Sequence, residues 1–164
     1  MRRFGLLFAA VATFVGCGPG DNELGGSISE LFPLEVSRVD VLRNEHALQI
    51  SYYRNHGAEV DLVLRLTVAL QDLEVKPGAK LDLAGEYAPG HPRTTVVHIG
   101  SGEPTRHFPR VQHGDLTIDE GGNVGEPTRG DFSLSFEQSG EFGSGRTAFG
   151  GFNGTAQDAG FGDP

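Results

Sequence analysis

The residues best suited to chemistry in this sequence are its histidines. Four of the six fall within a stretch of 23 residues: His91, His98, His107 and His113. Zinc sites need ligands that converge in space, and their sequence spacings are usually short and recognisable. The spacings here are 7, 9 and 6 residues, which match no zinc template. We therefore expect exposed loop histidines and no metal site.

A second group of candidate ligands surrounds a glycine pair. Asp115, Asp119, Glu120 and Asn123 place oxygen-bearing side chains on both sides of Gly121-Gly122. Calcium prefers such oxygen ligands, but the spacing departs from that of a calcium-binding EF-hand loop. Asp and Asn are also common turn residues, because their side chains bond to nearby backbone. A calcium loop and a simple turn both remain open from the sequence.

No motif in the chain indicates an enzyme. It contains no nucleophile elbow, phosphate-binding Walker loop, zinc-protease motif or paired-cysteine site. A pair of catalytic carboxylates stays open, since 22 acidic residues offer many pairings. The formal net charge of −9 argues against binding to nucleic acid. We predict a protein without catalytic residues, cofactor or metal.

The start of the chain has the organisation of an export signal. Arg2 and Arg3 precede an apolar run over residues 4–15, which ends at Gly16-Cys17, the only cysteine in the protein. About a dozen apolar residues suit a secretory signal and fall short of the ~20 that span a bilayer. The position of Cys17 directly after this run needs its own explanation.

Phe14-Val15-Gly16-Cys17 resembles the lipobox of bacterial lipoproteins, in which a branched apolar residue and two small residues precede the cysteine. Phe14 stands where Leu is usual, and Val15 where Ala or Ser is usual. The resemblance implies a diacylglycerol thioether on Cys17, cleavage after Gly16 and anchoring to a membrane without spanning it. Two or three acyl chains anchor a protein stably. Gly18 follows the cysteine in place of Asp, which by resemblance implies the outer membrane.

These features divide the chain into four parts. We predict a signal peptide at 1–16, the lipidated cysteine with a flexible tether at 17–29, a folded domain at 30–156 and a disordered tail at 157–164. Loss of Arg2 and Arg3 with the signal leaves 11 basic and 22 acidic residues, a net charge of −11. The mature length of 148 residues suggests one domain, held by packing alone because no cysteine is left to pair.

Short runs of alternating apolar and polar residues predict strands throughout this domain. The clearest is 58–70, where apolar residues occupy six even positions from Val60 to Leu70 while Asp61, Arg65 and Thr67 lie between them. A helix would scatter this pattern around its circumference, whereas a strand puts it on one face. We predict that the even face is core. The other predicted strands are 34–42, 47–54, 79–87, 94–99, 115–118, 131–138 and 146–156.

This pattern predicts an all-β fold, an antiparallel β-sandwich of seven or eight strands. The domain resembles an immunoglobulin-like or related sandwich in architecture, and that likeness implies no function. From the sequence we expect a lipid-anchored cell-envelope protein that is a non-catalytic interaction or structural module with an envelope protein partner. The alternative is a module that binds a ligand, sugar or calcium, through loops at one end of the sandwich (88–93, 100–114 and 119–130).

Overall fold

A computed structural model describes residues 21–138 and 145–161 of the chain. The predicted signal peptide, residues 1–16, and the predicted lipid-attachment residue Cys17 lie outside these ranges. The described residues form strands and a single 3-10 helix, which confirms the all-β prediction. The elements are β1 (Leu24–Gly25), η1 (Ser27–Glu30), β2 (Arg38–Arg43), β3 (Ala47–His56), β4 (Glu59–Ala69), β5 (Lys80–Asp82), β6 (Glu86–Ala88), β7 (His91–Pro92), β8 (Thr94–Ile99), β9 (Arg106–His107), β10 (Val111–Glu120), β11 (Pro127–Phe136) and β12 (Thr147–Asp158).

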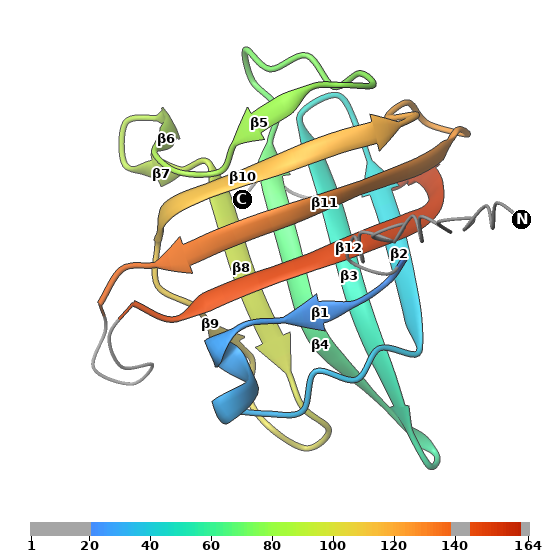
Figure 1. Cartoon of the computed structure of the whole chain (residues 1–164), viewed down its shortest axis with the longest axis vertical. Coiled ribbons are helices and arrows are strands. Elements are labelled where there is room, and N and C mark those ends of the chain that lie inside the picture. The colour runs from blue at the N-terminus through green and yellow to red at the C-terminus, as the bar shows by residue number, and fades with distance from the viewer. Residues whose placement is uncertain (1–20, 139–144, 162–164) are drawn as a thin grey trace, which may run out of the picture.

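Ten of the strands form one sheet that curls over itself. Its order is β5-β10-β11-β12-β2-β3-β4-β8-β9, with β1 paired to β12 beside that path. Figure 1 shows β10, β11 and β12 as a front layer that crosses β2, β3, β4 and β8 behind it. The remaining strands, β6 and β7, form a separate two-stranded ribbon.

The two layers join where β12 pairs with β2. This pairing is parallel and runs through Ala156–Val41 and Gln157–Leu42, so the sheet is mixed and not purely antiparallel. The described residues contain twelve strands in place of the predicted seven or eight. Strands β1, β7 and β9 have two residues each, which is too few to show an alternating pattern in sequence. The immunoglobulin-like resemblance is not confirmed.

The space between the layers is filled by the apolar residues that the alternating sequence pattern predicts on the inner faces of the strands. Leu48, Ile50 and Tyr52 of β3 are fully buried, and they meet Phe132 and Phe136 of β11 in one apolar cluster. The Tyr52 hydroxyl donates a hydrogen bond of 3.0 Å to the carbonyl of Gly151 on β12. This bond ties the two layers together and satisfies a hydroxyl that would otherwise be buried without a partner.

Both ends of the folded domain extend beyond the predicted range 30–156. Leu24 and Gly25, predicted as tether, pair with Gly150 and Phe149 of β12, and Ile28 is fully buried. At the other end, Gln157 and Asp158, predicted as tail, continue β12 beside β2. Burial of Ile28 explains why the folded domain begins before residue 30, because an apolar side chain within a polar segment gains roughly 1.5–3 kcal/mol from packing.

Candidate functional site

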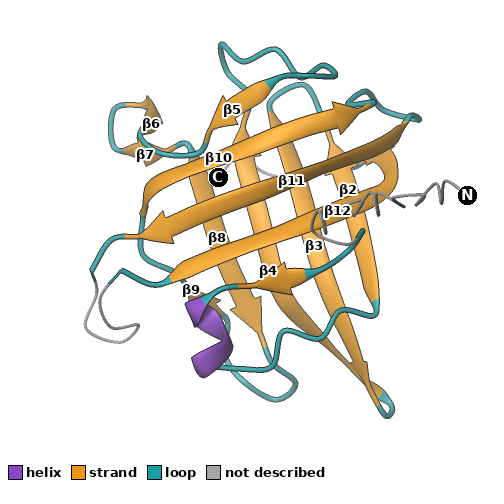
Figure 2. Ribbon diagram, viewed as in Figure 1, coloured by secondary structure: helices purple, strands orange, loops and turns teal. Residues whose placement is uncertain are grey.

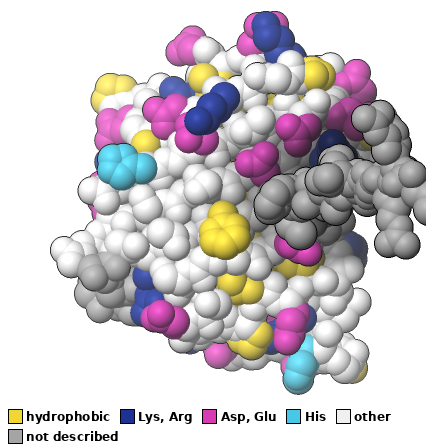
Figure 3. Space-filling view, in the orientation of Figure 1, with side chains coloured by type: hydrophobic (Ala, Val, Ile, Leu, Met, Phe, Trp, Pro, Cys, Tyr) yellow, Lys and Arg dark blue, Asp and Glu magenta, His cyan; other side chains and the backbone are white. Residues whose placement is uncertain are grey.

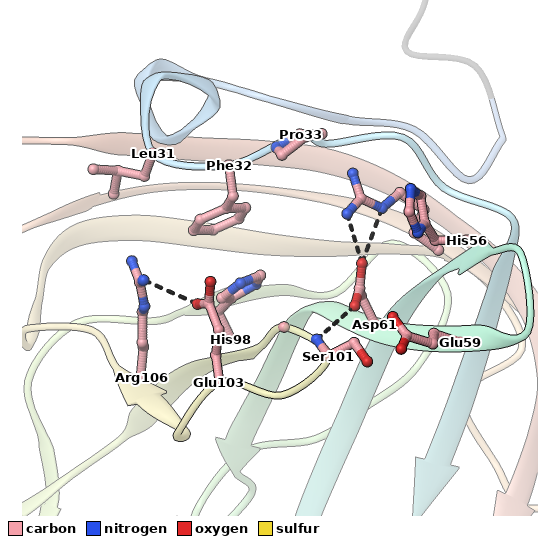
Figure 4. A pocket seen from close by; sticks show the side chains of 12 residues that line it. Leu31, Phe32, Pro33, His56, Glu59, Asp61, His98, Ser101, Glu103 and Arg106 are labelled. Atoms are coloured by element: carbon pink, nitrogen blue, oxygen red, sulfur yellow. Dashed lines mark hydrogen bonds and ion pairs between the residues drawn. The ribbon is translucent and has the colours of Figure 1, made fainter.

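A cleft of about 330 Å³ opens at one end of the two layers (Figure 4). It lies beside η1, the helix drawn in purple in Figure 2, and β9. Three parts of the chain form it: the segment after η1, the hairpin of β3 and β4, and the end of β8 with the loop to β9. Its lining residues are Leu31, Phe32, Pro33, Arg54, His56, Glu59, Asp61, His98, Gly100, Ser101, Glu103 and Arg106. Charged and aromatic side chains therefore replace the apolar core at this end.

A β-bulge in β4 turns polar side chains towards the cleft. Tyr52 pairs with Leu64 and Tyr53 with Leu62, so Val63 is an extra residue in β4. Such an insertion exchanges the two faces of the strand beyond it. Asp61 is consequently 5% exposed, whereas Val60 is 55% exposed. The prediction that the even face from 60 to 70 is core is wrong at Val60, because alternation in sequence cannot reveal a bulge.

Asp61 is held on both carboxylate oxygens. Its Oδ2 accepts hydrogen bonds from Arg54 Nη2 at 2.6 Å and Nε at 3.1 Å, while Oδ1 accepts the Ser101 backbone N–H at 2.7 Å. The hydrogen bonds from Arg54 lower the pKa of the Asp61 carboxyl most, and the bond from Ser101 lowers it further. The ionised carboxylate thus fastens the loop after β8 to the hairpin of β3 and β4.

His98 lies at the inner end of the cleft in a fixed orientation. Its strand, β8, buries alternate residues, and His98 follows Thr94 and Val96 on the inward face with 6% of its surface exposed. Its Nδ1 lies 2.9 Å from the carbonyl oxygen of Val63, the bulge residue. The ring of Phe32 stacks on the imidazole with 3.8 Å between centroids and 10° between planes.

The loop after β8 contributes a second ion pair. Arg106 Nη2 lies 2.9 Å from Glu103 Oε2. The cleft therefore contains two guanidinium groups and three carboxylates, and two of those carboxylates, on Asp61 and Glu103, are each paired with an arginine. This arrangement presents fixed donors and acceptors without a strong excess of either charge.

The four closely spaced histidines are not brought together. His98 lines the cleft, whereas His91, His107 and His113 lie exposed on β7, β9 and β10. Over residues 21–138 and 145–161, no group of three or more His, Cys, Asp or Glu side chains could hold a metal ion. The Asp115 cluster is also divided, since Asp115 pairs with Lys80 at 3.0 Å and Asn123 bonds to Glu126 within a turn.

Of the three loops predicted to form a site at one end, one reaches the cleft. From the predicted loop 100–114, Gly100, Ser101, Glu103 and Arg106 line the cleft, whereas no residue of 88–93 or 119–130 does. Phe32, Arg54 and Asp61 also line the cleft, and none of them is predicted as a site residue from the sequence. Asp61 is the single acid between Val60 and Leu70, the first and last of the alternating apolar residues, which is the one signal in sequence that could have drawn attention to it.

Comparisons with known proteins give no relative. No protein-family model, no curated protein and no solved structure matches this chain. Among the residues that the structure describes, no helix has both the length and the apolar character needed to cross a bilayer. Any functional conclusion must therefore come from the cleft and the sequence themselves.

Proposed function

We propose that this protein is a lipid-anchored, non-catalytic module of the bacterial cell envelope and that its cleft binds a small polar ligand. The cleft carries the proposal, because polar groups from three separate parts of the chain converge there in fixed positions. Its volume, about 330 Å³, lies within the range of about 300–1,000 Å³ that is usual for small-molecule sites.

The signal sequence supports the location. Phe14-Val15-Gly16-Cys17 resembles a lipobox, and Gly18 favours the outer membrane. Leu24, the first residue of β1, follows Cys17 by seven positions. Even a fully extended chain of that length spans at most about 25 Å. The domain would therefore stay close to the membrane surface.

The charges in the cleft favour an uncharged ligand. Asp61 and Glu103 are each committed to an arginine, and the lowered pKa of Asp61 keeps that carboxylate ionised at neutral pH. Calcium would have to displace these pairs, and calcium sites use six to eight oxygen ligands. Of the two ligand classes expected from the sequence, sugar fits this arrangement better than calcium.

The surface gives less support to an envelope protein partner. Within residues 21–138 and 145–161, the exposed large apolar side chains lie in three different places: Val60 on β4, Val124 before β11 and Phe149 on β12. On the face over β10–β12, apolar side chains are scattered and do not form one continuous patch (Figure 3). Sites for protein partners usually present one contiguous apolar patch.

Ligand-observed NMR of the purified mature protein in detergent micelles, against a library of sugars and other small polar molecules, tests this function. Ser101 lines the cleft and has an exposed side chain, so Ser101→Trp should block binding. Ser133→Trp, on the exposed outer face of β11, is the matched control and should bind like the wild type. Equal binding by both variants, or no ligand for the wild type, would contradict the proposal.

A further inference from the structure

We propose that His98 determines the specificity of the cleft and that it recognises the adjacent hydroxyl groups of a pyranose sugar. One hydroxyl would donate to Nε2 of His98 and its neighbour to the carboxylate of Glu103. This inference rests on the proposed function, since it names the ligand chemistry of the same cleft.

The contact between His98 and Val63 decides which ring nitrogen carries the proton. Nδ1 lies 2.9 Å from the Val63 carbonyl oxygen. A carbonyl oxygen can only accept a hydrogen bond, so Nδ1 must donate and hold the hydrogen. In the neutral imidazole, Nε2 then has a free lone pair and can only accept. A ligand group that meets Nε2 must therefore be a donor, such as a hydroxyl.

The ring cannot easily turn to change this arrangement. Phe32 stacks on one face of the imidazole at 3.8 Å and also contacts Phe108 edge to face, with 6.1 Å between those centroids. His98 itself is 6% exposed. A buried, stacked ring with one nitrogen already bonded presents its other nitrogen in a fixed direction, which is what selective recognition requires.

A second acceptor lies next to Nε2. The point that a Cβ on Gly100 would occupy is 3.5 Å from Nε2 of His98 and 3.4 Å from Oε2 of Glu103. Both acceptors thus border the same small space, which stays open because residue 100 has no side chain. Glu103 is itself oriented by Arg106, 2.9 Å away.

Two acceptors beside one space select a ligand with two adjacent donors. Neighbouring hydroxyls on a sugar ring have this form, and the Arg106 guanidinium beside them could donate to a sugar oxygen. A phosphate or carboxylate ligand in this space would lie against the carboxylate of Glu103 and would be repelled by it. An organic ammonium ion is the rival donor, and the experiment includes it.

The tautomer can be tested without any ligand. Long-range ¹H–¹⁵N correlation of the histidine-labelled mature protein at neutral pH should show Nδ1 of His98 protonated and Nε2 bare. His98→Phe, which retains a flat ring and loses both nitrogens, assigns the signals. A hydrogen on Nε2 in the free protein would overturn the inference, because Nε2 would then be a donor.

Binding then tests the role of His98. The probes are methyl α-mannopyranoside, methyl β-galactopyranoside, their deoxy analogues that lack one of two adjacent hydroxyls, and an alkylammonium salt. We expect at least one pyranoside to bind, and the deoxy analogue and the His98→Phe variant each to lose roughly tenfold or more in affinity, as loss of a buried hydrogen-bond partner does. Gly100→Ala, which fills the space between the acceptors, should weaken binding similarly even if His98→Phe does not fold.

A matched glycine variant controls for general effects. Gly160→Ala meets nothing within 4 Å and should leave binding unchanged. A pyranoside that binds wild type and both cleft variants equally would overturn this inference and leave the proposed function standing. Binding of the alkylammonium ion without binding of any pyranoside would also overturn this inference and leave the proposed function standing. If neither these probes nor the polar library occupies the cleft, the proposed function falls as well.

Discussion

The ring of Phe32 lies parallel to the imidazole of His98, with 3.8 Å between the two centroids. Phe32 belongs to the segment after η1 and His98 to β8, so the stack fastens the N-terminal segment over the cleft. The same imidazole bonds to the backbone of Val63, the bulge residue of β4. One side chain thus links three elements that are distant in sequence.

Phe32→Leu tests the contribution of this stack. Leucine keeps an apolar side chain and loses the aromatic pairing, which is worth about 0.5–1.5 kcal/mol. We expect the melting temperature to fall by roughly 3 °C for a domain of this size. Phe149→Leu on β12, where the ring is 50% exposed, is the control and should change it little. Equal effects of the two substitutions, measured by circular dichroism, would contradict a specific role for the stack.

Asp61→Asn tests the buried ion pair with Arg54. Loss of these charge-assisted bonds should lower the free energy of unfolding by roughly 2 kcal/mol at neutral pH. Because folding lowers the pKa of Asp61, its contribution is present above the unfolded-state pKa and is lost as pH falls through the folded-state pKa. The stability difference between wild type and Asp61→Asn should therefore shrink as the solution becomes more acidic.

Urea denaturation across an acidic pH series measures this difference. Glu74→Gln breaks the exposed pair of Glu74 with Lys76 and serves as the control, with an effect near zero at every pH. A difference for Asp61→Asn that stays constant down to the lowest pH would show that Asp61 is not the titrating group.

The sequence could predict which side chains are buried wherever apolar and polar residues alternate along a regular strand. Leu64, Leu66 and Val68 are buried as the even positions required, because side chains on a regular strand alternate between faces. The bulge at Val63 could not be predicted, since it follows from pairing with both neighbouring strands. Val60 and Asp61 are accordingly exchanged between the two faces relative to the prediction.

A pair of aspartate substitutions distinguishes the faces on either side of the bulge. Leu64→Asp buries an unpaired charge in the core and should unfold the domain. Val60 lies four residues earlier and would share the face of Leu64 if the strand were regular. Val60→Asp should nevertheless be tolerated, because Val60 is 55% exposed. Thermal melts of both variants provide the comparison. An unfolded Val60→Asp variant would show that the bulge does not exchange the faces.

The cleft itself was predictable only in part. His98 drew attention as one of four closely spaced histidines, and 100–114 was expected to be a binding loop. Neither Phe32 nor Arg54 is marked by a local sequence pattern. Phe32 contributes through its contact with His98, more than 40 residues away. Arg54 contributes through an ion pair with the neighbouring strand. Sequence spacing reveals sites whose ligands are neighbours in the chain, and this cleft is assembled from three distant segments.

Cys17→Ser tests the proposed anchor. Serine cannot form the thioether, so the variant loses the acyl chains, and we expect it to leave the membrane fraction. Gly18→Asp is the matched variant: it keeps the cysteine and, by the sorting pattern of bacterial lipoproteins, should shift the protein from the outer to the inner membrane. Fractionation of cells labelled with a clickable fatty acid measures lipidation and location together. Unchanged membrane retention of Cys17→Ser would end the lipoprotein proposal, whereas loss of label with an intact cleft would separate anchoring from ligand binding.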